Sequence, residues 1–216
     1  MSSKLKLGVM ISGRGSNLKS LIEATQESDF PAEIVIVIAN IPKISGIEIA
    51  TKANIPTCVI DHNHFSNRKL FEDKVHTALV NAGVELVCLA GFMRILTDYF
   101  VSLWLNKIIN IHPSLLPSFK GLNTHNRAIK SGTKFSGCTV HYVRPEMDTG
   151  PIIIQAAVAI NQSDTPDILA SRILVEEHRI YPTAVKLIAT NRISIVNNLV
   201  KIKNIEPTYS ILINPS

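Results

Sequence analysis

Short aliphatic runs alternate with helix-like segments through most of this chain, and this alternation restricts the possible folds more than any other feature. The run at 34–39, with sequence IVIVIA, is typical. Strands that are aliphatic on both faces occur in parallel sheets covered by helices on each side. Successive parallel strands are joined by right-handed crossovers through a helix. The sequence therefore predicts an α/β fold with a doubly wound, mostly parallel and twisted sheet.

The segments that follow this rhythm can be assigned in chain order. Apolar runs predict strands at 5–11, 34–39, 57–60, 85–90 and 108–112. Helical spacing of apolar residues predicts helices after residue 17 and at 45–53, 66–81, 99–104 and 124–129, the last capped by Thr124. The first five strands and their helices predict a Rossmann-like N-terminal half.

The second half of the chain changes character. A strand at 138–143, a long turn and a strand at 152–160 predict an antiparallel edge. Thr165 and Pro166 begin a helix that runs toward Thr190 and should kink or break at Pro182. The segment 193–202, with two asparagines between apolar runs, predicts a terminal hairpin.

Composition bounds the class of protein. The chain has 216 residues, of which 46% are hydrophobic and 18% charged, so one large domain with a substantial core is expected. No aliphatic run approaches the roughly 20 residues of a membrane span. The N-terminus enters a strand without a signal-peptide core, so we expect a cytoplasmic protein without membrane association.

The net positive charge suits small anionic ligands, and the cysteines and histidines do not predict a metal site. The formal charge of +5 is scattered rather than striped, which argues against nucleic acid as a partner. Cys58, Cys88 and Cys138 lack metal-ligand spacing and predict buried free thiols. The polar stretch at 61–64, with sequence DHNH, reads more easily as a loop than as a metal site.

The most suggestive polar residues lie at the end of the strand at 108–112. Period-two alternation puts Asn110 and His112 on one face, about 7 Å apart. Pro113 then ends the strand, because proline has no N–H to donate. Open α/β sheets bind ligands at the carboxyl ends of their strands. A carboxamide beside an imidazole there predicts chemistry, although a capped turn and a packed histidine would give the same pattern.

Two further loops follow predicted strands. The stretch 12–17, with sequence SGRGSN, joins a strand to a helix and predicts either a phosphate site or a plain turn with Ser16 as N-cap. The stretch 91–96, with sequence GFMRIL, is apolar for a loop. Its side chains either fold back into the core or form the wall of a ligand pocket.

Five motifs together resemble one family. They are ISGRGSN at 11–17, LAGFMRIL at 89–96, NIHPSLLP at 110–117, GCTVHYV at 137–143 with DTGPII at 148–153, and EEHRIYP at 176–182. In order and spacing they resemble the glycinamide ribonucleotide formyltransferases of purine biosynthesis. The resemblance covers about residues 5–190 and implies the formyltransferase fold. It also implies transfer of a formyl group from the co-substrate 10-formyltetrahydrofolate to the amine of glycinamide ribonucleotide, without a metal.

The resemblance implies a catalytic trio of Asn110, His112 and Asp148. The residue types suit the chemistry, because charge builds on the formyl oxygen as the amine attacks. A carboxamide can donate to that oxygen, and an imidazolium can stabilise it. A carboxylate can support the charged imidazole and relay the proton of the amine.

The resemblance also implies two sets of binding residues. The ribonucleotide would be bound by Gly15, Ser16, Asn17 and Glu177. The folate would be bound by Arg68, Met93, Arg94, Ile95, Leu96 and Asn110, with Arg68 meeting its acidic tail. His125 and His141 fall in family motifs and are expected to support the site. Lys120 departs from the family, since many relatives have proline there.

These implications complete a set of expectations for the whole protein. Residues 1–216 would form one formyltransferase domain, with a nucleotide-binding half at about 1–100, a catalytic and folate-binding half at about 101–190 and a C-terminal hairpin at 191–216. It would act on small molecules as a monomer or homodimer. A 10-formyltetrahydrofolate hydrolase is the main alternative. A methionyl-tRNA formyltransferase would need a further domain, and a nucleotide sensor would not use the trio.

Overall fold

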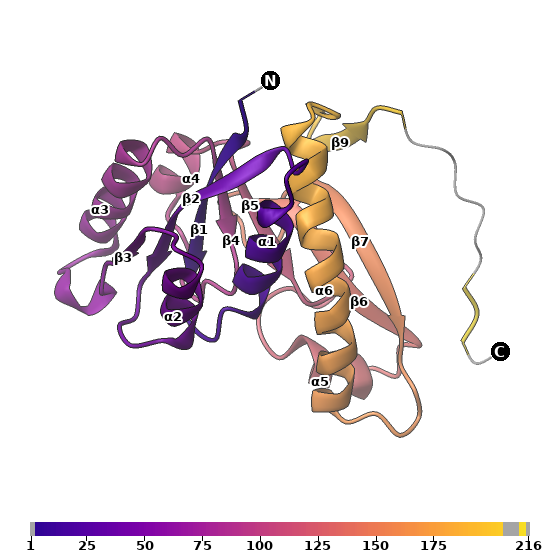
Figure 1. Cartoon of the computed structure of the whole chain (residues 1–216). Helices are drawn as coiled ribbons and strands as arrows, with labels where there is room; N and C mark the ends of the chain where they lie inside the picture. The colour runs from indigo at the N-terminus through magenta and orange to yellow at the C-terminus, as the bar shows by residue number, and fades with distance from the viewer. Residues whose placement is uncertain (1–2, 205–211, 215–216) are drawn as a thin grey trace.

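The structure is a computed structural model that describes residues 3–204 and 212–214. Its centre is a seven-stranded sheet in the order β3-β2-β1-β4-β5-β6-β7 (Figure 1). The strands of this sheet are β1 (Leu5–Ile11), β2 (Ala32–Ala39), β3 (Thr57–Val59), β4 (Leu86–Leu89), β5 (Ile108–His112), β6 (Phe135–Tyr142) and β7 (Ile152–Ala159). The helices are α1 (Ser16–Gln26), α2 (Ser45–Lys52), α3 (Arg68–Asn81), α4 (Asp98–Leu103), α5 (Thr124–Lys130) and α6 (Pro166–Ala189), with a short 3₁₀ helix at His62–His64.

The pairing of the strands confirms the predicted sheet. Strands β1 to β5 pair in parallel, whereas β6 pairs antiparallel with both β5 and β7. The chain builds outward from β1 to β3 and then returns to add β4 on the other side of β1. The sheet thus has its topological switch point beside β1 and β4, where α/β sheets of this kind bind ligands.

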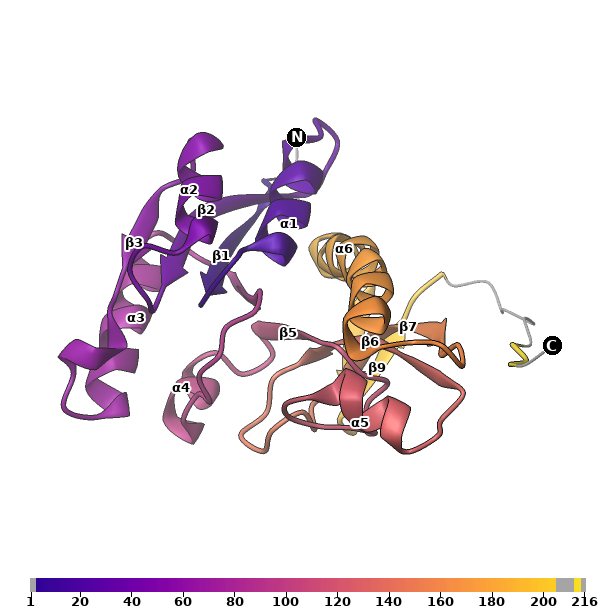
Figure 2. The ribbon, with the colours of Figure 1, turned by 90° about the horizontal axis from the view of Figure 1, so that it is seen from below.

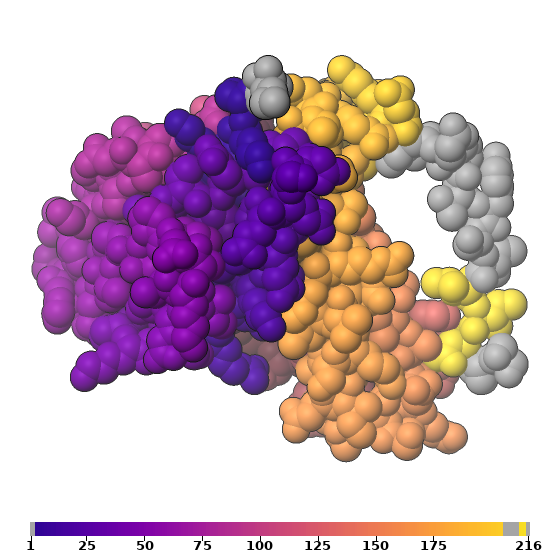
Figure 3. All heavy atoms as spheres, in the orientation of Figure 1, coloured from indigo at the N-terminus to yellow at the C-terminus, as the bar shows by residue number. Residues whose placement is uncertain are grey.

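Helices cover both faces of the sheet, as expected for near-continuous aliphatic strands. Alternate residues of β2 show the reason, since Val37 and Ala39 join one core while Ile36 and Ile38 join the other. The first core contains residues of α1, α2 and α6, and the second contains residues of α3 and α4. Helices α1 and α6 lie side by side although they are about 150 residues apart in sequence (Figures 2 and 3).

Two predictions about helices are wrong, namely a break at Pro182 and a cap at Thr124. Helix α6 continues through Pro182 to Ala189 without a break. Proline costs about 3 kcal/mol in a helix interior, but the neighbouring Tyr181 and Val185 are fully buried and their packing holds the helix together. Thr124 is the first residue of α5 rather than its cap. The cap position is held by Asn123, whose φ of 57° is one that asparagine tolerates better than threonine.

The predicted C-terminal hairpin is present as β8 (Ile193–Val196) and β9 (Leu199–Ile202). Its turn residues, Asn197 and Asn198, have φ values of 51° and 60°, as a two-residue turn between twisted strands requires. The rest of the expected segment at 191–216 includes residues 205–211 and 215–216, which lie outside the described residues. In the described part of the chain, no helix is long and apolar enough to cross a membrane.

One buried tyrosine of α6 contacts two central strands near the end of the ladder between them. The hydroxyl of Tyr181 lies 3.0 Å from the carbonyl oxygen of Leu89 and 3.3 Å from that of Ile109. The ladder between β4 and β5 ends at Leu89 and Asn110, while β5 continues to His112. Tyr181 therefore ties the two strands together at the point where they begin to separate.

We predict that Tyr181→Phe lowers the free energy of unfolding by about 1–3 kcal/mol, because it leaves two buried carbonyl oxygens without this donor. Urea unfolding followed by circular dichroism would measure the change. Tyr99→Phe removes the same hydroxyl from a side chain that is 38% exposed and serves as the control. Equal effects of the two substitutions would contradict the role assigned to Tyr181.

Candidate active site

A cavity of about 630 Å³ lies beyond the carboxyl ends of β4 and β5. This volume is within the range of small-molecule sites. Its lining is mostly apolar, with polar groups from four separate segments of the chain. The described lining residues are Leu89, Gly91, Phe92, Met93, Arg94, Ile95, Leu96, Asn110, Ile111, His112, Pro113, Gly121, Leu122, Asn123, Thr124, His125, His141, Val143, Arg144, Pro145, Met147 and Asp148.

Asn110 and His112 both reach this cavity from β5, as the strand periodicity predicts. His112 is only 7% exposed, and its Nε2 lies 3.1 Å from the carbonyl oxygen of Phe119. A carbonyl only accepts, so Nε2 carries a proton and donates it there. The other ring nitrogen, Nδ1, lies 3.5 Å from Oδ2 of Asp148. The imidazole is thus held between a fixed acceptor and a carboxylate.

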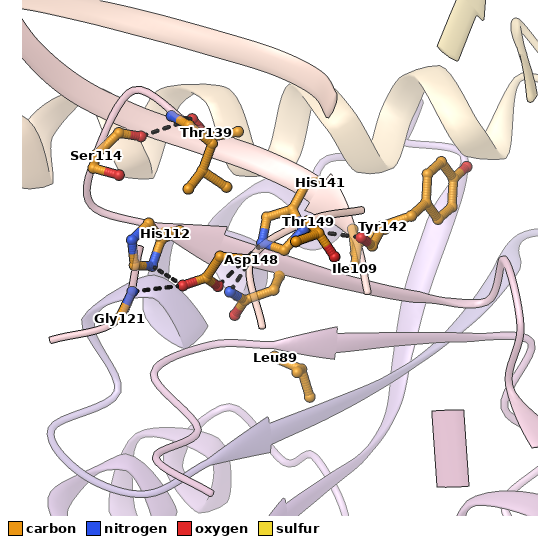
Figure 4. Close-up of polar contacts among 12 residues, drawn as sticks. Leu89, Ile109, His112, Ser114, Gly121, Thr139, His141, Tyr142, Asp148 and Thr149 are labelled. Atoms are coloured by element: carbon orange, nitrogen blue, oxygen red, sulfur yellow. Dashed lines mark hydrogen bonds and ion pairs between the residues drawn. The ribbon is translucent and has the colours of Figure 1, made fainter. Parts of the chain in front are cut away.

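Asp148 comes from the loop between β6 and β7, and its side chain lies between His112 and His141 (Figure 4). The backbone N–H of Gly121 donates to its Oδ2 at 2.8 Å, and its Oδ1 lies 3.7 Å from Nε2 of His141. Its own φ is 55°, in the left-handed region that few residues other than glycine, asparagine and aspartate adopt. The loop therefore holds this carboxylate, whose side chain is 10% exposed, between two histidines.

His141 lies directly opposite Asn110 in the antiparallel ladder of β5 and β6. Its Nδ1 donates to the carbonyl oxygen of Tyr142 at 2.9 Å, which leaves Nε2 of the neutral ring as an acceptor. Nδ2 of Asn110 lies 3.3 Å from this nitrogen and donates to it. Burial lowers the pKa of His141 and so favours the neutral ring, although Tyr142 and Asp148 act in the opposite direction. One N–H of the Asn110 amide is thereby fixed, and the second remains for a ligand.

A buried polar network fixes the loop that follows His112. The hydroxyl of Thr139 donates to the carbonyl oxygen of Ser114 at 2.7 Å and accepts from the backbone N–H of Leu116 at 3.1 Å. The side-chain amide of Gln155 donates to the carbonyl oxygen of Leu116 at 3.0 Å. Strands β6 and β7 therefore hold the Pro-Ser-Leu-Leu-Pro loop in one position.

The apolar loop at 91–96 serves both of the purposes considered for it. Leu96 and Phe92 are 7% and 8% exposed and belong to the core, whereas Met93 and Ile95 are 69% and 57% exposed and line the cavity. The backbone N–H of Met93 donates to the hydroxyl of Ser12 at 2.8 Å. The loop is thus anchored to the end of β1, and it presents apolar side chains to a ligand.

The glycine loop at 12–17 forms a separate surface. Gly15 has a φ of 77°, and a Cβ atom built on it would lie 2.7 Å from Cα of Gly46, so only glycine fits. Gly15 is the residue at the cap of α1, and no described side chain caps this helix. Ser16 is therefore the first helical residue and not the N-cap considered from the sequence. An uncapped helix start of this kind presents backbone N–H groups to an anion.

Asn17 and Glu177 meet next to this loop from opposite ends of the chain. Nδ2 of Asn17 donates to Oε2 of Glu177 at 2.6 Å, and the two residues are 8% and 7% exposed. Burial raises the pKa of Glu177, and the bond from Asn17 partly offsets this effect. Oδ1 of Asn17 is buried without a hydrogen-bond partner among the described residues. This pair is poised to receive a polar ligand group.

The residues singled out from the sequence thus fall into two clusters and one outlier. The cavity receives Met93, Arg94, Ile95, Leu96, Asn110, His112 and Asp148. The glycine loop gathers Gly15, Ser16, Asn17 and Glu177. Arg68, at the start of α3, is not among the described residues that line the cavity.

Two features of the site were not found from the sequence. The amide of Gly121 is a main-chain donor, and the only sequence signal for it was a glycine, which has a φ of 76° here. Arg144 lines the cavity from a turn that the sequence marked only as long. His125 also lines the cavity. Burial lowers the pKa of His125, and the nearby His112 is the second cause.

Neither a metal centre nor a disulfide is built by the described part of the chain. Within residues 3–204 and 212–214, no cluster of three His, Cys, Asp or Glu side chains could hold a metal ion. The stretch at 61–64 forms a turn in which Oδ1 of Asp61 accepts from the backbone N–H of Asn63 at 3.0 Å. Cys58, Cys88 and Cys138 are free thiols, and burial raises the pKa of both Cys88 and Cys138 to about 12.

Curated relatives of two different lengths match this chain. It is 41% identical over 194 residues to the phosphoribosylglycinamide formyltransferase of Haemophilus influenzae, covering 90% of this chain and 92% of that protein. It is 45% identical over 195 residues to the trifunctional purine biosynthetic protein adenosine-3 of Bos taurus, covering 90% of this chain and 19% of that protein. The chain thus spans about a fifth of the length of this larger relative.

The fold and the family pattern agree with these relatives. The glycinamide ribonucleotide transformylase 1 from Symbiobacterium toebii has a solved structure that superposes with a TM-score of 0.91 at 40% identity, covering 94% of this chain and 95% of that one. The pattern of the formyl transferase family matches residues 5–185. This chain therefore belongs to the formyl transferase family.

Proposed function

We propose that this protein transfers the formyl group of 10-formyltetrahydrofolate to the amine of glycinamide ribonucleotide, a step of purine biosynthesis. The products are N-formylglycinamide ribonucleotide and tetrahydrofolate. The observation that carries the proposal is the meeting of Asn110, His112 and Asp148 at one wall of the cavity. Relatives that this chain covers almost completely bear the name phosphoribosylglycinamide formyltransferase.

The proposed reaction begins with attack of the amine nitrogen on the formyl carbon, which moves an electron pair onto the formyl oxygen. The free N–H of the Asn110 amide donates to that oxygen, since His141 holds the other one. His112, when protonated, places a positive charge beside the developing negative charge of that oxygen. Preformed donors of this kind stabilise a developing oxyanion because they need no reorganisation as charge appears.

The intermediate then collapses, and the bond between the formyl carbon and the folate nitrogen breaks. The amine loses one proton and the folate nitrogen gains one, so the transfer needs no net proton supply. Asp148, 3.5 Å from His112, supports the protonated ring and accepts the proton of the amine directly or through a water. Neither a covalent enzyme intermediate nor a metal takes part in this proposal.

The two substrates are assigned to the two clusters. The ribonucleotide phosphate binds at Gly15, Ser16 and Asn17, where the uncapped helix offers N–H donors. Glu177 accepts from ribose hydroxyl groups. The folate lies in the cavity against Met93, Arg94, Ile95 and Leu96 and reaches Asn110. Arg68 remains the proposed partner of its acidic tail, outside the cavity itself.

We also propose how the chain is organised and where it works. Residues 1–216 act as one domain, with a nucleotide-binding half at about 1–100, a catalytic half at about 101–190 and the folate bound between the two halves. A monomer or homodimer is sufficient, because every residue assigned to the chemistry lies on one chain. A cytoplasmic location would keep the three thiols reduced.

We predict that the purified protein consumes 10-formyltetrahydrofolate only when glycinamide ribonucleotide is present, because the amine is the acceptor. Formylated ribonucleotide and formate would both be quantified. Product without formate supports the transferase. Release of formate in the absence of the ribonucleotide would instead identify a 10-formyltetrahydrofolate hydrolase and would refute the proposed acceptor.

The catalytic assignment predicts that His112→Ala and Asp148→Asn each lower kcat by roughly 100-fold to 10,000-fold, as loss of a general acid–base or oxyanion group does. Calorimetry should find ribonucleotide binding nearly unchanged, because neither residue belongs to the glycine-loop cluster. His64→Ala, in a side chain that is 80% exposed, serves as the control. A variant that keeps normal turnover would remove its residue from the mechanism.

The ribonucleotide assignment predicts that Asn17→Ala raises Kd for the ribonucleotide by about tenfold or more, because it leaves the buried Glu177 without its donor. Titrations would compare this change with that for the folate, which should be much smaller. Ser20→Ala is the matched control, since that hydroxyl donates only within α1, to the carbonyl oxygen of Asn17. A larger loss of folate affinity would contradict the phosphate-site assignment.

A further inference from the structure

Arg144 connects the wall of the cavity with the C-terminal hairpin. It follows β6 by two residues, lines the cavity and is partly buried. It also begins the loop that carries Asp148. The sequence analysis predicted no role for Arg144, and it identified no functional motif in the hairpin.

Three hydrogen bonds from different parts of the chain fix the Arg144 guanidinium. Nε donates to Oδ1 of Asn198 at 3.1 Å, Nη2 donates to Oδ1 of Asn106 at 2.8 Å, and Nη1 donates to the carbonyl oxygen of Val143 at 3.0 Å. Asn198 lies in the turn between β8 and β9, and Asn106 lies just before β5. The orientation of the guanidinium therefore depends on the hairpin.

These bonds leave part of the guanidinium for a ligand. Arginine has five N–H donors, and three are used within the described residues. Among the described residues that line the cavity, Arg94 and Arg144 are the two with permanent positive charge. The Arg94 guanidinium lies 5.5 Å from the centre of the Phe71 ring and stacks there. Arg144 is thus the cavity cation whose position is set by hydrogen bonds.

The two asparagines that accept hydrogen bonds from Arg144 share the same backbone conformation. Asn198 has a φ of 60° and Asn106 also has a φ of 60°. Both lie in the left-handed region, which asparagine tolerates. A two-stranded hairpin is only marginally stable alone, so its place on the protein depends on such contacts and on packing. Ile193, Ile195 and Val200 supply that packing against the main core.

We propose that the C-terminal hairpin is part of the folate site, because Asn198 holds Arg144 where its free N–H donors bind a carbonyl or carboxylate oxygen of 10-formyltetrahydrofolate. The inference rests on the proposed function, since it takes the folate as the occupant of the cavity. Arg144 contacts the co-substrate directly, and Asn198 is a positioning residue that acts through it.

The test replaces each turn asparagine by glycine, which accepts the positive φ and removes only the side-chain amide. Asn198→Gly should raise KM for 10-formyltetrahydrofolate about threefold to tenfold, with kcat and KM for the ribonucleotide unchanged. The reason is that an interaction of equal strength in the ground and transition states contributes to KM alone. Asn197→Gly, the neighbouring turn residue with a φ of 51°, should change nothing. Arg144→Met should raise the same KM at least as much as Asn198→Gly.

The outcomes separate this inference from the proposed function. Equal KM values for Asn198→Gly and Asn197→Gly would overturn the inference while the wild-type transferase activity stands. A fall in kcat without a change in KM would also overturn it, because the hydrogen bond between Asn198 and Arg144 would then act on Asp148 and not on the folate. A wild-type protein that shows no ribonucleotide-dependent transfer would refute the proposed function itself. Equilibrium titration of the variants with tetrahydrofolate provides a readout that does not depend on turnover.

Discussion

The arrangement of the site depends on the register between β5 and β6. In this antiparallel pair Asn110 lies opposite His141, and His112 lies opposite Thr139. A slip by one residue would turn both β5 side chains toward the other face of the sheet, because successive side chains alternate. The same register brings Thr139 to the loop after His112 and His141 to the Asn110 amide. One ladder therefore sets both the orientation of the reactive groups and the loop that encloses them.

Helix α6 joins the two clusters of the site. Glu177 and Tyr181 are four residues apart and so lie on one face of the helix. Glu177 meets Asn17 at the start of α1, and Tyr181 meets the carbonyl oxygens of β4 and β5. This face is packed deeply enough that Pro182, between them and the helix end, does not interrupt it. A shift of α6 would thus disturb the Asn17–Glu177 pair and the cavity together.

Burial of polar groups is the cost that these contacts offset. Asn17, His112, His141 and Glu177 are all at most 8% exposed. A buried polar group without a partner costs about 1–3 kcal/mol. Each of these side chains has at least one hydrogen-bond partner, whereas Oδ1 of Asn17 has none among the described residues. Hydrogen bonds within the protein thus orient these side chains, and preformed orientation favours stabilisation of a charged transition state.

The sequence alone was sufficient for what depends on local patterns. Aliphatic runs predicted the parallel sheet, strand periodicity placed Asn110 and His112 on one face, and motif spacing identified the family. It was less reliable where tertiary packing competes with local preference, as at Pro182. It was also less reliable where the residue at the helix cap has a left-handed backbone and no capping side chain, as at Gly15 and Asn123.

Only the tertiary structure decided which distant residues meet. Asp148 reaches His112 from the loop between β6 and β7, and Arg144 reaches Asn198 because the hairpin packs beside β7. Such contacts depend on how whole elements pack together, and no periodicity within a single element encodes them.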